Sequence, residues 1–379
     1  CLYLSTHPLG ITYNSLGVCS GCIVHEEKYT IDWNLRRQRL EEIVNRYKTE
    51  TNYDCVVPVT GGQDSFFTLH YVKFILKLNP LVVNFNRVMN TAQGLKNLAR
   101  LKMKFDVDFH QESMNPRTVK KVIAVTMENL GSINWFWIAG QTSLPVRVAR
   151  DFNIPLIIWG AHQGVEQVGM FSHLDEVEMT KRYRNEHDLM GIDERGIFKF
   201  DCDFNENDLA SISYPSDKEI LTQGIRGIYL SNYVKWDPVA QHTFVRRKYG
   251  YLGKKQKRTY YPYDNPDCTT YMGFQDELKK LKVGYSKVTD QLCREIRHKR
   301  ISRSEALKVQ KVFGNVSDQK RNKDFAEWLG TTPESLEALK WRHSKDFVKG
   351  MEEFDSTSKK AVNSEKKRIG NFEIVSKGL

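Results

Sequence analysis

The sequence lacks several features that would settle its class at once. No apolar run approaches the roughly 20 residues that a membrane-spanning helix needs, so a membrane span is not expected. The Walker motif G-x-x-x-x-G-K-[ST] is absent, which excludes that form of phosphate-binding loop. No segment is repeated, which argues against a solenoid or a propeller.

Acidic residues are too few to balance the basic ones. The chain has 46 aspartates and glutamates against 57 lysines and arginines, which gives a net charge of +11. A dispersed positive charge attracts any anion, nucleotides and nucleotide sugars included, so nucleic acid is not the expected partner. Seven cysteines in 379 residues indicate metal ligands or reduced thiols rather than a disulfide scaffold, which predicts a cytoplasmic protein.

From residue 51 onward, short apolar runs alternate with amphipathic segments. The runs CVVPV (55–59), PLVVNFN (80–86), FDVDFHQ (105–111) and IPLIIWG (154–160) predict strands. The segments 65–77, 91–102, 116–130 and 140–151 predict helices. This alternation predicts an α/β fold with a doubly wound parallel sheet, in which ligands bind beyond the carboxyl ends of the strands.

The chain is predicted to have three regions. Residues 1–50 hold a cysteine-containing, zinc-ribbon-like segment and an amphipathic helix, and residues 51–270 form the sheet domain with an irregular, substrate-facing insertion from about 161. Residues 271–379 form a helical region with a lysine-rich tail. In that region a capping box from Ser302 to Glu305 predicts one helix start, and Thr332 before Pro333 predicts another.

The seam between the first strand and its helix reads TGGQDS (60–65). Glycines between a strand's carboxyl end and a helix's amino end suit an anion, because backbone N–H groups and the helix dipole point there. A tight turn that needs glycine only for its positive φ would explain Gly61 and Gly62 alone. The added polar residues Thr60, Asp64 and Ser65 favour a phosphate site.

This stretch resembles the SGGxDS pyrophosphate loop of the N-type ATP pyrophosphatases, which split ATP between the α and β phosphates and adenylate a carbonyl oxygen. The resemblance implies that Asp64 and Ser65 take part in catalysis and that Asp64 binds Mg²⁺, since a carboxylate beside a polyanion requires a cation between them. Gln63 stands where several families place lysine, which removes one cationic phosphate contact. The residues implied as ATP contacts are Thr60, Gly61, Gly62, Gln63, Asp64 and Ser65.

A longer series of segments resembles the N-acetyl sugar amidotransferases of bacterial surface-polysaccharide synthesis, such as lipopolysaccharide O-antigen. The series is GVCSGC, IDWNLRRQRLEEIV, NTAQGLKNLARL, IIWGAHQGVEQ and ELKKLKVGYSKVTDQLCREIRHKRISRSEAL, and it covers residues 1 to 310 or so. The resemblance implies conversion of the acetamido group of a nucleotide-linked sugar to an acetamidino group, with ATP and ammonia. It also implies that a separate class I glutaminase subunit of the HisH type supplies the ammonia.

Residues after the other strands are further candidates. Gly160 and His162 follow the fourth strand and are expected to contact the nucleotide, although a turn-capping role explains His162 equally well. Glu166 is a candidate for magnesium binding and catalysis. Asn84 follows the second strand, where this fold usually places the adenine ring.

Two basic clusters are candidates for phosphate contacts. Lys181 and Arg182 would neutralise pyrophosphate, although a solvated helix face explains such a run as often. Arg294, Arg297 and His298 are candidates to close over the phosphates.

Cys19 and Cys22 form a C-x-x-C pair, and Cys1 lies upstream at zinc-ribbon distance. These spacings predict a structural Zn²⁺ site whose fourth ligand lies upstream of the given chain, with Cys268 as the fallback ligand. Burial without a metal is the better interpretation of Cys55, which falls in a predicted strand.

Two other classes of function stay open. A pyrophosphate-loop enzyme that modifies tRNA, such as a thiolase or a lysidine-synthetase-like enzyme, would suit the net positive charge. Sulfur transfer often needs a cysteine pair near the ATP site, however, and no cysteine falls between residues 56 and 201. A non-catalytic zinc-ribbon binding module would leave the TGGQDS loop unexplained.

Overall fold

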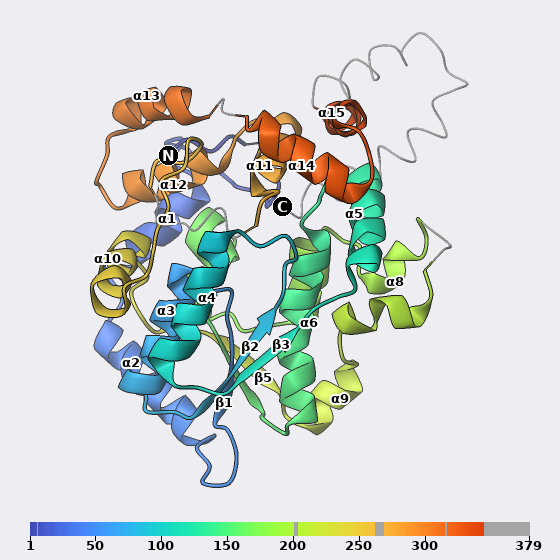
Figure 1. Cartoon of the computed structure of the whole chain (residues 1–379). Helices are drawn as coiled ribbons and strands as arrows, with labels where there is room; N and C mark the ends of the chain where they lie inside the picture. The colour runs from blue at the N-terminus through green and yellow to red at the C-terminus, as the bar shows by residue number, and fades with distance from the viewer. Residues whose placement is uncertain (6, 201–203, 262–268, 315–316, 345–379) are drawn as a thin grey trace.

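The computed structural model describes residues 1–5, 7–200, 204–261, 269–314 and 317–344. At its centre lies a parallel five-stranded sheet in the order β3-β2-β1-β4-β5 (Figure 1). The strands are β1 (Cys55–Pro58), β2 (Pro80–Phe85), β3 (Phe109–Glu112), β4 (Leu156–Trp159) and β5 (Arg226–Tyr229). The predicted doubly wound α/β fold is confirmed, because the strand order reverses at β1, which pairs with β2 on one side and β4 on the other.

Helices cover both faces of the sheet, and successive strand residues enter opposite cores. Val56 and Val83 pack with α5 (Pro116–Leu130) and α6 (Trp135–Asp151). Val57 and Val82 pack on the other face. That face is covered by α2 (Trp33–Asn45), α3 (Gln63–His70), α4 (Ala92–Phe105) and α10 (Pro238–Tyr249). Burial on both faces is what strands of a parallel sheet require.

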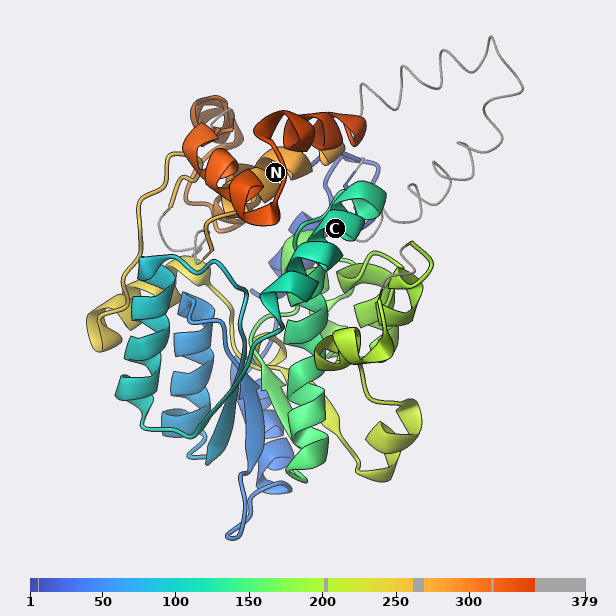
Figure 2. The same cartoon turned by 45° about the vertical axis from the view of Figure 1, so that its right-hand side comes forward.

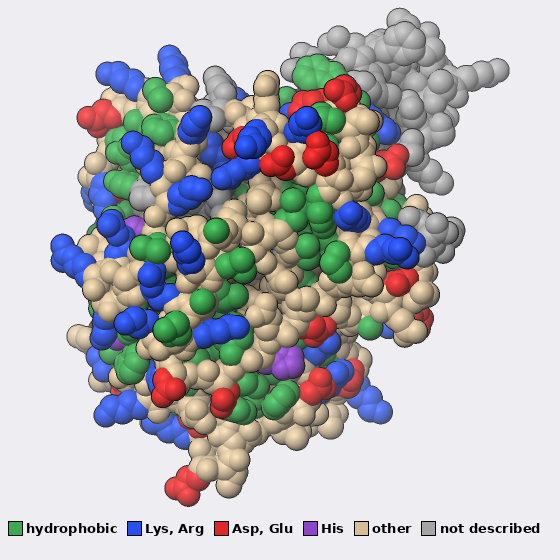
Figure 3. All heavy atoms as spheres, in the orientation of Figure 1, with side chains coloured by type: hydrophobic (Ala, Val, Ile, Leu, Met, Phe, Trp, Pro, Cys, Tyr) green, Lys and Arg blue, Asp and Glu red, His purple; other side chains and the backbone are tan. Residues whose placement is uncertain are grey.

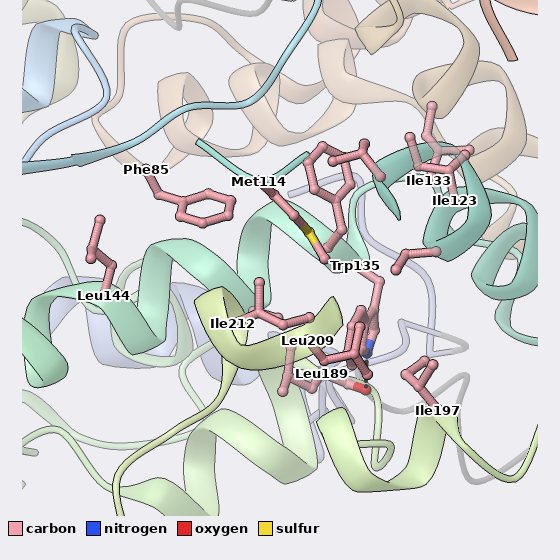
Figure 4. Packing of buried hydrophobic residues seen from close by; sticks show 14 of the residues in the cluster. Phe85, Met114, Ile123, Ile133, Trp135, Leu144, Leu189, Ile197, Leu209 and Ile212 are labelled. Carbon is pink, nitrogen blue, oxygen red and sulfur yellow. Dashed lines mark hydrogen bonds between the residues drawn. The ribbon is translucent and has the colours of Figure 1, made fainter. Parts of the chain in front are cut away.

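The core beside α6 is closed by short segments from the middle of the chain. In Figure 4, Leu209 and Ile212 of η5 (Glu206–Ile212) lie against the α6 side of this core, near Trp135. The Trp135 indole N–H donates to the carbonyl oxygens of Leu189, at 3.3 Å, and Ile192, at 2.9 Å. Trp135 therefore ties the start of α6 to the chain that follows β4.

Local signals place several helix starts where they were predicted. The Thr91 hydroxyl accepts the N–H of Gly94 at 3.1 Å and caps α4. Pro116 begins α5. The capping box of Ser302 and Glu305 begins α13 (Arg303–Phe313), and Thr332 caps α15 (Pro333–Arg342). These helix starts could be predicted because each one depends only on neighbours within four residues in the sequence.

The stretch from 161 to 270 is more regular than predicted. It supplies β5 and α10, both of which belong to the sheet and its cover. Short turns and helices make up much of the chain between β4 and α10. Those before β5 include η2 (Gly164–Val168), η3 (His173–Asp175), α7 (Lys181–Tyr183), η4 (Arg184–Asp188), α8 (Glu194–Ile197) and α9 (Asp217–Thr222), and η6 (Leu230–Asn232) follows β5. Elsewhere α6 begins at Trp135, before the predicted residue 140, and α3 continues into one π-helical turn, η1 (Tyr71–Ile75).

The C-terminal helices lie over the edge of the sheet to which the strand arrows point (Figures 1 and 2). They are α11 (Met272–Val283), α12 (Lys287–Arg297), α13, α14 (Gln319–Leu329) and α15. The first residues of the chain pack on them, since Leu2, Tyr3 and Ile11 share a core with Val288 and Leu292. The predicted lysine-rich tail lies outside the described residues.

The surface agrees with the net charge. In Figure 3, lysine and arginine side chains gather on the side of the molecule that α10, α12 and α13 form. The last turn of α10 carries Arg246, Arg247 and Lys248. None of the helices in the described parts of the chain combines the length and the apolar character needed to span a bilayer.

Candidate active site

The TGGQDS loop joins β1 to α3 and is shaped by its own residues. The Thr60 N–H donates to the Ser65 hydroxyl at 2.9 Å, and the two hydroxyl oxygens lie 3.4 Å apart. Gly61 has a φ of +79°, and a Cβ there would lie 3.3 Å from the backbone of Leu98. Gly62 begins α3 without a side-chain cap, so the amino end of the helix keeps the geometry that suits an anion.

This loop lines a cavity of about 510 Å³, a size within the roughly 300–1,000 Å³ range of ligand sites. The cavity opens where β1 and β4 end, which is the point at which the strand order reverses and the place where α/β sheets bind ligands. Three walls enclose it: the loop with the chain after β4, the start of α6, and a C-terminal wall made by Arg258 together with residues of α11 and α12.

The α6 wall combines aromatic and neutral polar groups. Trp137 carries the Arg87 guanidinium over its ring at 3.9 Å, and Arg87 donates to the Gln141 side-chain oxygen at 3.0 Å. Four cavity-lining residues have a buried polar atom without a hydrogen-bond partner in the described part of the chain: Thr68, Asn134, Trp137 and Trp159. Each such atom costs about 1–3 kcal/mol, so their concentration here is characteristic of a binding site rather than of a packed core.

The C-terminal wall is built around Asp290. Its carboxylate accepts hydrogen bonds from Lys279 Nζ at 2.7 Å, the Tyr3 hydroxyl at 2.7 Å and Gln167 Nε2 at 3.0 Å. Burial opposes its charge, but the nearby Lys279 and Lys287 hold the pKa of Asp290 below its usual range. Asp290 is therefore a fixed, ionised carboxylate that orients Lys279.

Asp276 is a second carboxylate that fixes neighbouring groups on this wall. Arg258 Nη1 donates to Asp276 Oδ2 at 2.9 Å, and the Lys287 backbone N–H donates to Asp276 Oδ1 at 2.6 Å. Neither these residues nor Lys279 and Asp290 were predicted as site residues. No local motif marks them, because the wall exists only when Arg258, α11 and α12 come together.

Most of the predicted loop residues line the cavity. Thr60, Gly62, Gln63, Asp64 and Ser65 do so, and Gly160 joins them from the chain after β4. Gln63 Nε2 lies 3.4 Å from the Asp64 carboxylate. Gly61 does not line the cavity; its backbone lies against Leu98 of α4.

Other predicted residues do not line it. The Asn84 side-chain N–H donates to the Val59 carbonyl oxygen at 2.8 Å, and this hydrogen bond links β2 to the end of β1. Lys181 lies 3.7 Å from Asp217, and Arg182 is an exposed partner of Glu186 at 2.9 Å. Their roles at the nucleotide stay predictions.

His162 is buried among the rings of Phe171, Tyr183 and Tyr229, with centroid distances of 5.6, 4.5 and 4.5 Å. Burial, together with the nearby His187, lowers the pKa of His162 to about 4. The ring is neutral at physiological pH, neither of its nitrogens has a hydrogen-bond partner in the described part of the chain, and its predicted contact with the nucleotide stays a prediction.

Glu166 belongs to a buried cluster next to the cavity, here named the polar junction: Lys28, Glu166 and Arg297. The Glu166 carboxylate lies 2.5 Å from Lys28 Nζ, and Lys28 also donates to the Trp236 carbonyl at 3.0 Å. Arg297 donates to the backbone oxygens of Glu166, at 3.3 Å, and Gln167, at 2.6 Å. These contacts join α1 (Ser20–Glu27) and its neighbouring turn to η2 and α12, so Glu166 and Arg297 hold elements together; their predicted contacts with magnesium and phosphate stay predictions.

The three predicted zinc ligands do come together. The sulfur atoms of Cys1, Cys19 and Cys22 lie within 4.8 Å of one another, and Arg297 Nη2 lies 4.0 Å from Cys1 Sγ and from Cys19 Sγ. A hydrogen bond from Cys19, together with the charge of Arg297, lowers the pKa of Cys22 to about 5, whereas the same hydrogen bond and burial raise the pKa of Cys19, so Cys22 is the thiolate of this pair.

The sulfur atoms are close enough together to share one metal ion. Tetrahedral thiolate zinc places sulfur atoms about 3.8 Å apart. Here Cys1 Sγ and Cys19 Sγ lie 3.1 Å apart, so this pair would have to separate slightly to bind zinc. Cys268, the fallback fourth ligand, lies outside the described residues. Cys55 is fully buried in β1, as predicted.

The last third of the chain matches a protein family. Residues 240–359 match the family model described as "LPS biosynthesis protein WbpG-like, C-terminal domain". That range includes the C-terminal wall of the cavity, and the match confirms, for this part, the resemblance to proteins of surface-polysaccharide synthesis.

Two further comparisons add less. Comparison with curated proteins gives no match. Among solved structures, the NH3-dependent NAD synthetase from Campylobacter jejuni subsp. jejuni NCTC 11168, in complex with the nitrate ion, is 16% identical, with a TM-score of 0.30 over 60% of this chain and 100% of that chain. A likeness at this level establishes neither ligand nor activity.

Proposed function

We propose that this protein is an ATP-dependent amidotransferase that converts the acetamido group of a nucleotide-linked sugar into an acetamidino group. The observation that carries the proposal is the make-up of one cavity. One wall is a TGGQDS loop at the start of a helix, and another comes from the part of the chain that matches a lipopolysaccharide-biosynthesis family. An enzyme that activates a surface-glycan sugar with ATP needs both in the same place.

The loop suits the pyrophosphate part of ATP. The Thr60 and Ser65 hydroxyls and the amino end of α3 offer uncharged donors, and glycine at 61 and 62 lets the backbone approach the phosphates. Asp64, in the first turn of α3, would hold a magnesium ion, which supplies charge neutralisation at the phosphates.

The chemistry follows from the poor reactivity of an amide. The acetamido oxygen attacks the α-phosphorus of ATP, the bond from that phosphorus to the bridging oxygen breaks, and pyrophosphate leaves. Ammonia then adds to the imidate carbon and loses a proton, and AMP departs with the former amide oxygen. In this proposal the ammonia comes from a separate class I glutaminase of the HisH type, as the resemblance to the N-acetyl sugar amidotransferases implies.

The cysteine cluster has a structural part in this proposal. Cys1, Cys19 and Cys22 would hold zinc with a fourth ligand, which would fix the first residues against α12. Metal analysis of the full-length protein should find one zinc per chain. Absence of zinc, together with a Cys19→Ser variant as stable as the wild type, would contradict this part.

Product analysis tests the function. Purified protein with ATP, magnesium, a nucleotide-linked N-acetyl sugar and ammonium should release AMP and pyrophosphate, and the sugar should become about one mass unit lighter as NH replaces O. Glutamine should replace ammonium only when the glutaminase is added. ADP and phosphate as products, or turnover with glutamine by this chain alone, would contradict the proposal, and AMP release that depends on tRNA would favour the modifying-enzyme alternative.

A further inference from the structure

The proposed reaction brings two anionic substrates into one cavity, and the cavity has anion-binding groups on two different walls. We propose that Lys279, Lys287 and Arg258 form the subsite for the phosphate groups of the nucleotide-linked sugar, separate from the loop that receives the pyrophosphate of ATP. This inference rests on the proposed function and names where its second substrate binds.

The two walls differ in chemistry. The loop side offers hydroxyl and backbone donors, and the position of a lysine in several related loops is taken by Gln63. Among the described residues, the C-terminal wall offers three cations, Lys279, Lys287 and Arg258, and two carboxylates, Asp276 and Asp290. An excess of fixed positive charge on a cavity wall attracts phosphate without help from a metal ion.

Two cations of this wall, Lys279 and Arg258, are held in place before any ligand arrives. Lys279 Nζ lies 2.7 Å from Asp290 and 4.4 Å from the centre of the Tyr285 ring. Arg258 is paired with Asp276 at 2.9 Å, and both side chains are about one-tenth exposed. Because a long side chain held in this way loses little freedom on binding, the wall is preorganised for an anion.

Asp290 is a positioning residue for Lys279. It is 2% exposed and accepts hydrogen bonds from Tyr3 and Gln167 as well as from the lysine. The first residues of the chain, the turn after β4 and α11 thus all meet at the carboxylate that sets the direction of one ammonium group. An ion pair that served only stability would not need to lie on a cavity wall.

The space between these two walls is bordered by aromatic rings and neutral amide groups, with the Arg87 guanidinium stacked on one of the rings. The α6 side contributes Asn134, Trp137 and Gln141, and β4 contributes Trp159. Aromatic faces with amide and indole hydrogen-bonding groups are the usual lining for an uncharged, polar ligand. A sugar whose phosphate end lies at Lys279 would therefore have its ring beside α6 and its acetamido group toward the loop.

Calorimetry with the full-length protein tests the assignment. The loop is first saturated with α,β-methylene-ATP and magnesium, and UDP-, GDP- and CMP-linked N-acetyl sugars are then titrated in turn. At least one should bind to the wild type. Lys279→Gln should weaken that binding about tenfold, because one charge-assisted hydrogen bond is lost, and leave binding of the ATP analogue within about twofold.

Matched variants exclude a folding effect. Lys308→Gln makes the same change at an exposed position of α13 and should alter neither affinity, while Lys279→Arg should keep most of the sugar affinity. Asp290→Asn should raise KM for the sugar more than it lowers kcat, provided that its unfolding transition stays cooperative.

Several results would overturn the inference. They are equal weakening of both ligands by Lys279→Gln, unchanged sugar binding in that variant, and no binding of any of the three sugars while the ATP analogue is bound. Failure of the proposed function would give a different result. If the sugar binds in a way that depends on Lys279 but no AMP is released, the proposed reaction is contradicted and the proposed subsite is supported.

Discussion

The cavity and the polar junction are neighbours past the end of β4, yet they use the same kinds of residue for opposite purposes. Gln163 and Gln167 line the cavity, whereas Glu166, between them in sequence, turns to Lys28. In the cavity, the pairs Lys279–Asp290 and Arg258–Asp276 border open volume, whereas in the junction the Lys28–Glu166 pair is enclosed by packed elements. A charged residue at the active edge of a sheet is therefore identified as functional by what it faces and not by its position in the sequence.

The largest effect is expected in the cavity. Asp64→Asn should lower the rate of AMP formation by roughly a hundredfold or more, because removing one group that stabilises transition-state charge typically lowers kcat by about this factor. Its urea midpoint should match that of the wild type. The control is Asp324→Asn, which changes an exposed carboxylate on α14. A variant with wild-type turnover at limiting magnesium would remove Asp64 from the reaction.

The junction should give the reverse pattern. Lys28→Met leaves the Glu166 carboxylate buried without its ion pair, so it should lower the free energy of unfolding by about 3–5 kcal/mol. Folded protein at low temperature should still bind the ATP analogue. The double variant Lys28→Met with Glu166→Leu should recover most of the loss, and failure to recover it would mean that the ion pair is not the source of the effect.

A pH series sharpens the contrast through His162. Its pKa is about 4 in the folded state against 6.5 as the ordinary value, so the folded state binds fewer protons between these two values. Stability from this group is present in full above pH 6.5 and declines as the pH falls toward 4, by about 2 kcal/mol at pH 5.

Urea unfolding at pH 7.5, 6 and 5 measures this dependence. The decline should be smaller in His162→Phe than in the wild type. Equal pH slopes in the two proteins would show that the ring is protonated or exposed in the folded state.

The smallest effect is expected for Arg182→Ala. Its side chain is 82% exposed and pairs only with Glu186 among the contacts of the described residues, outside the lining of the cavity. We expect a change in KM for ATP of less than about twofold, as for other surface pairs. A tenfold rise in KM would restore the predicted phosphate contact and would require α7 to move toward the loop.

How much the sequence predicts depends on the distance over which each feature is encoded. Strands β1 to β4, the capping box from Ser302 to Glu305 and the TGGQDS loop were predicted because their signals lie within one element or one turn. The strand β5 was missed since its four residues carry too short a pattern, with Gly227 in the middle. The cysteine cluster was predicted by its spacing alone.

The site residues show the same limit. Thr60 and Ser65 reach the cavity because the loop carries them there. Arg297 was expected at the phosphates but lies in the junction, and Lys279 was overlooked. Their places follow from how α11 and α12 dock on the sheet, which no local pattern encodes.

The docking of the first residues on α12 has a consequence for how the molecule is made. The Leu2 N–H reaches Cys293 Sγ at 3.2 Å and the Tyr3 hydroxyl reaches Asp290, contacts between residues 291 and 287 positions apart. Closing so long a chain costs entropy, and contacts of this kind form late in folding. During synthesis the TGGQDS loop and strands β1 to β4 are complete while α12 is still to be made. Until α12 is made, Leu2 and Tyr3 lack the residues against which they pack. The ribosome therefore releases residues 1–5 long before these residues can join the last wall of the cavity.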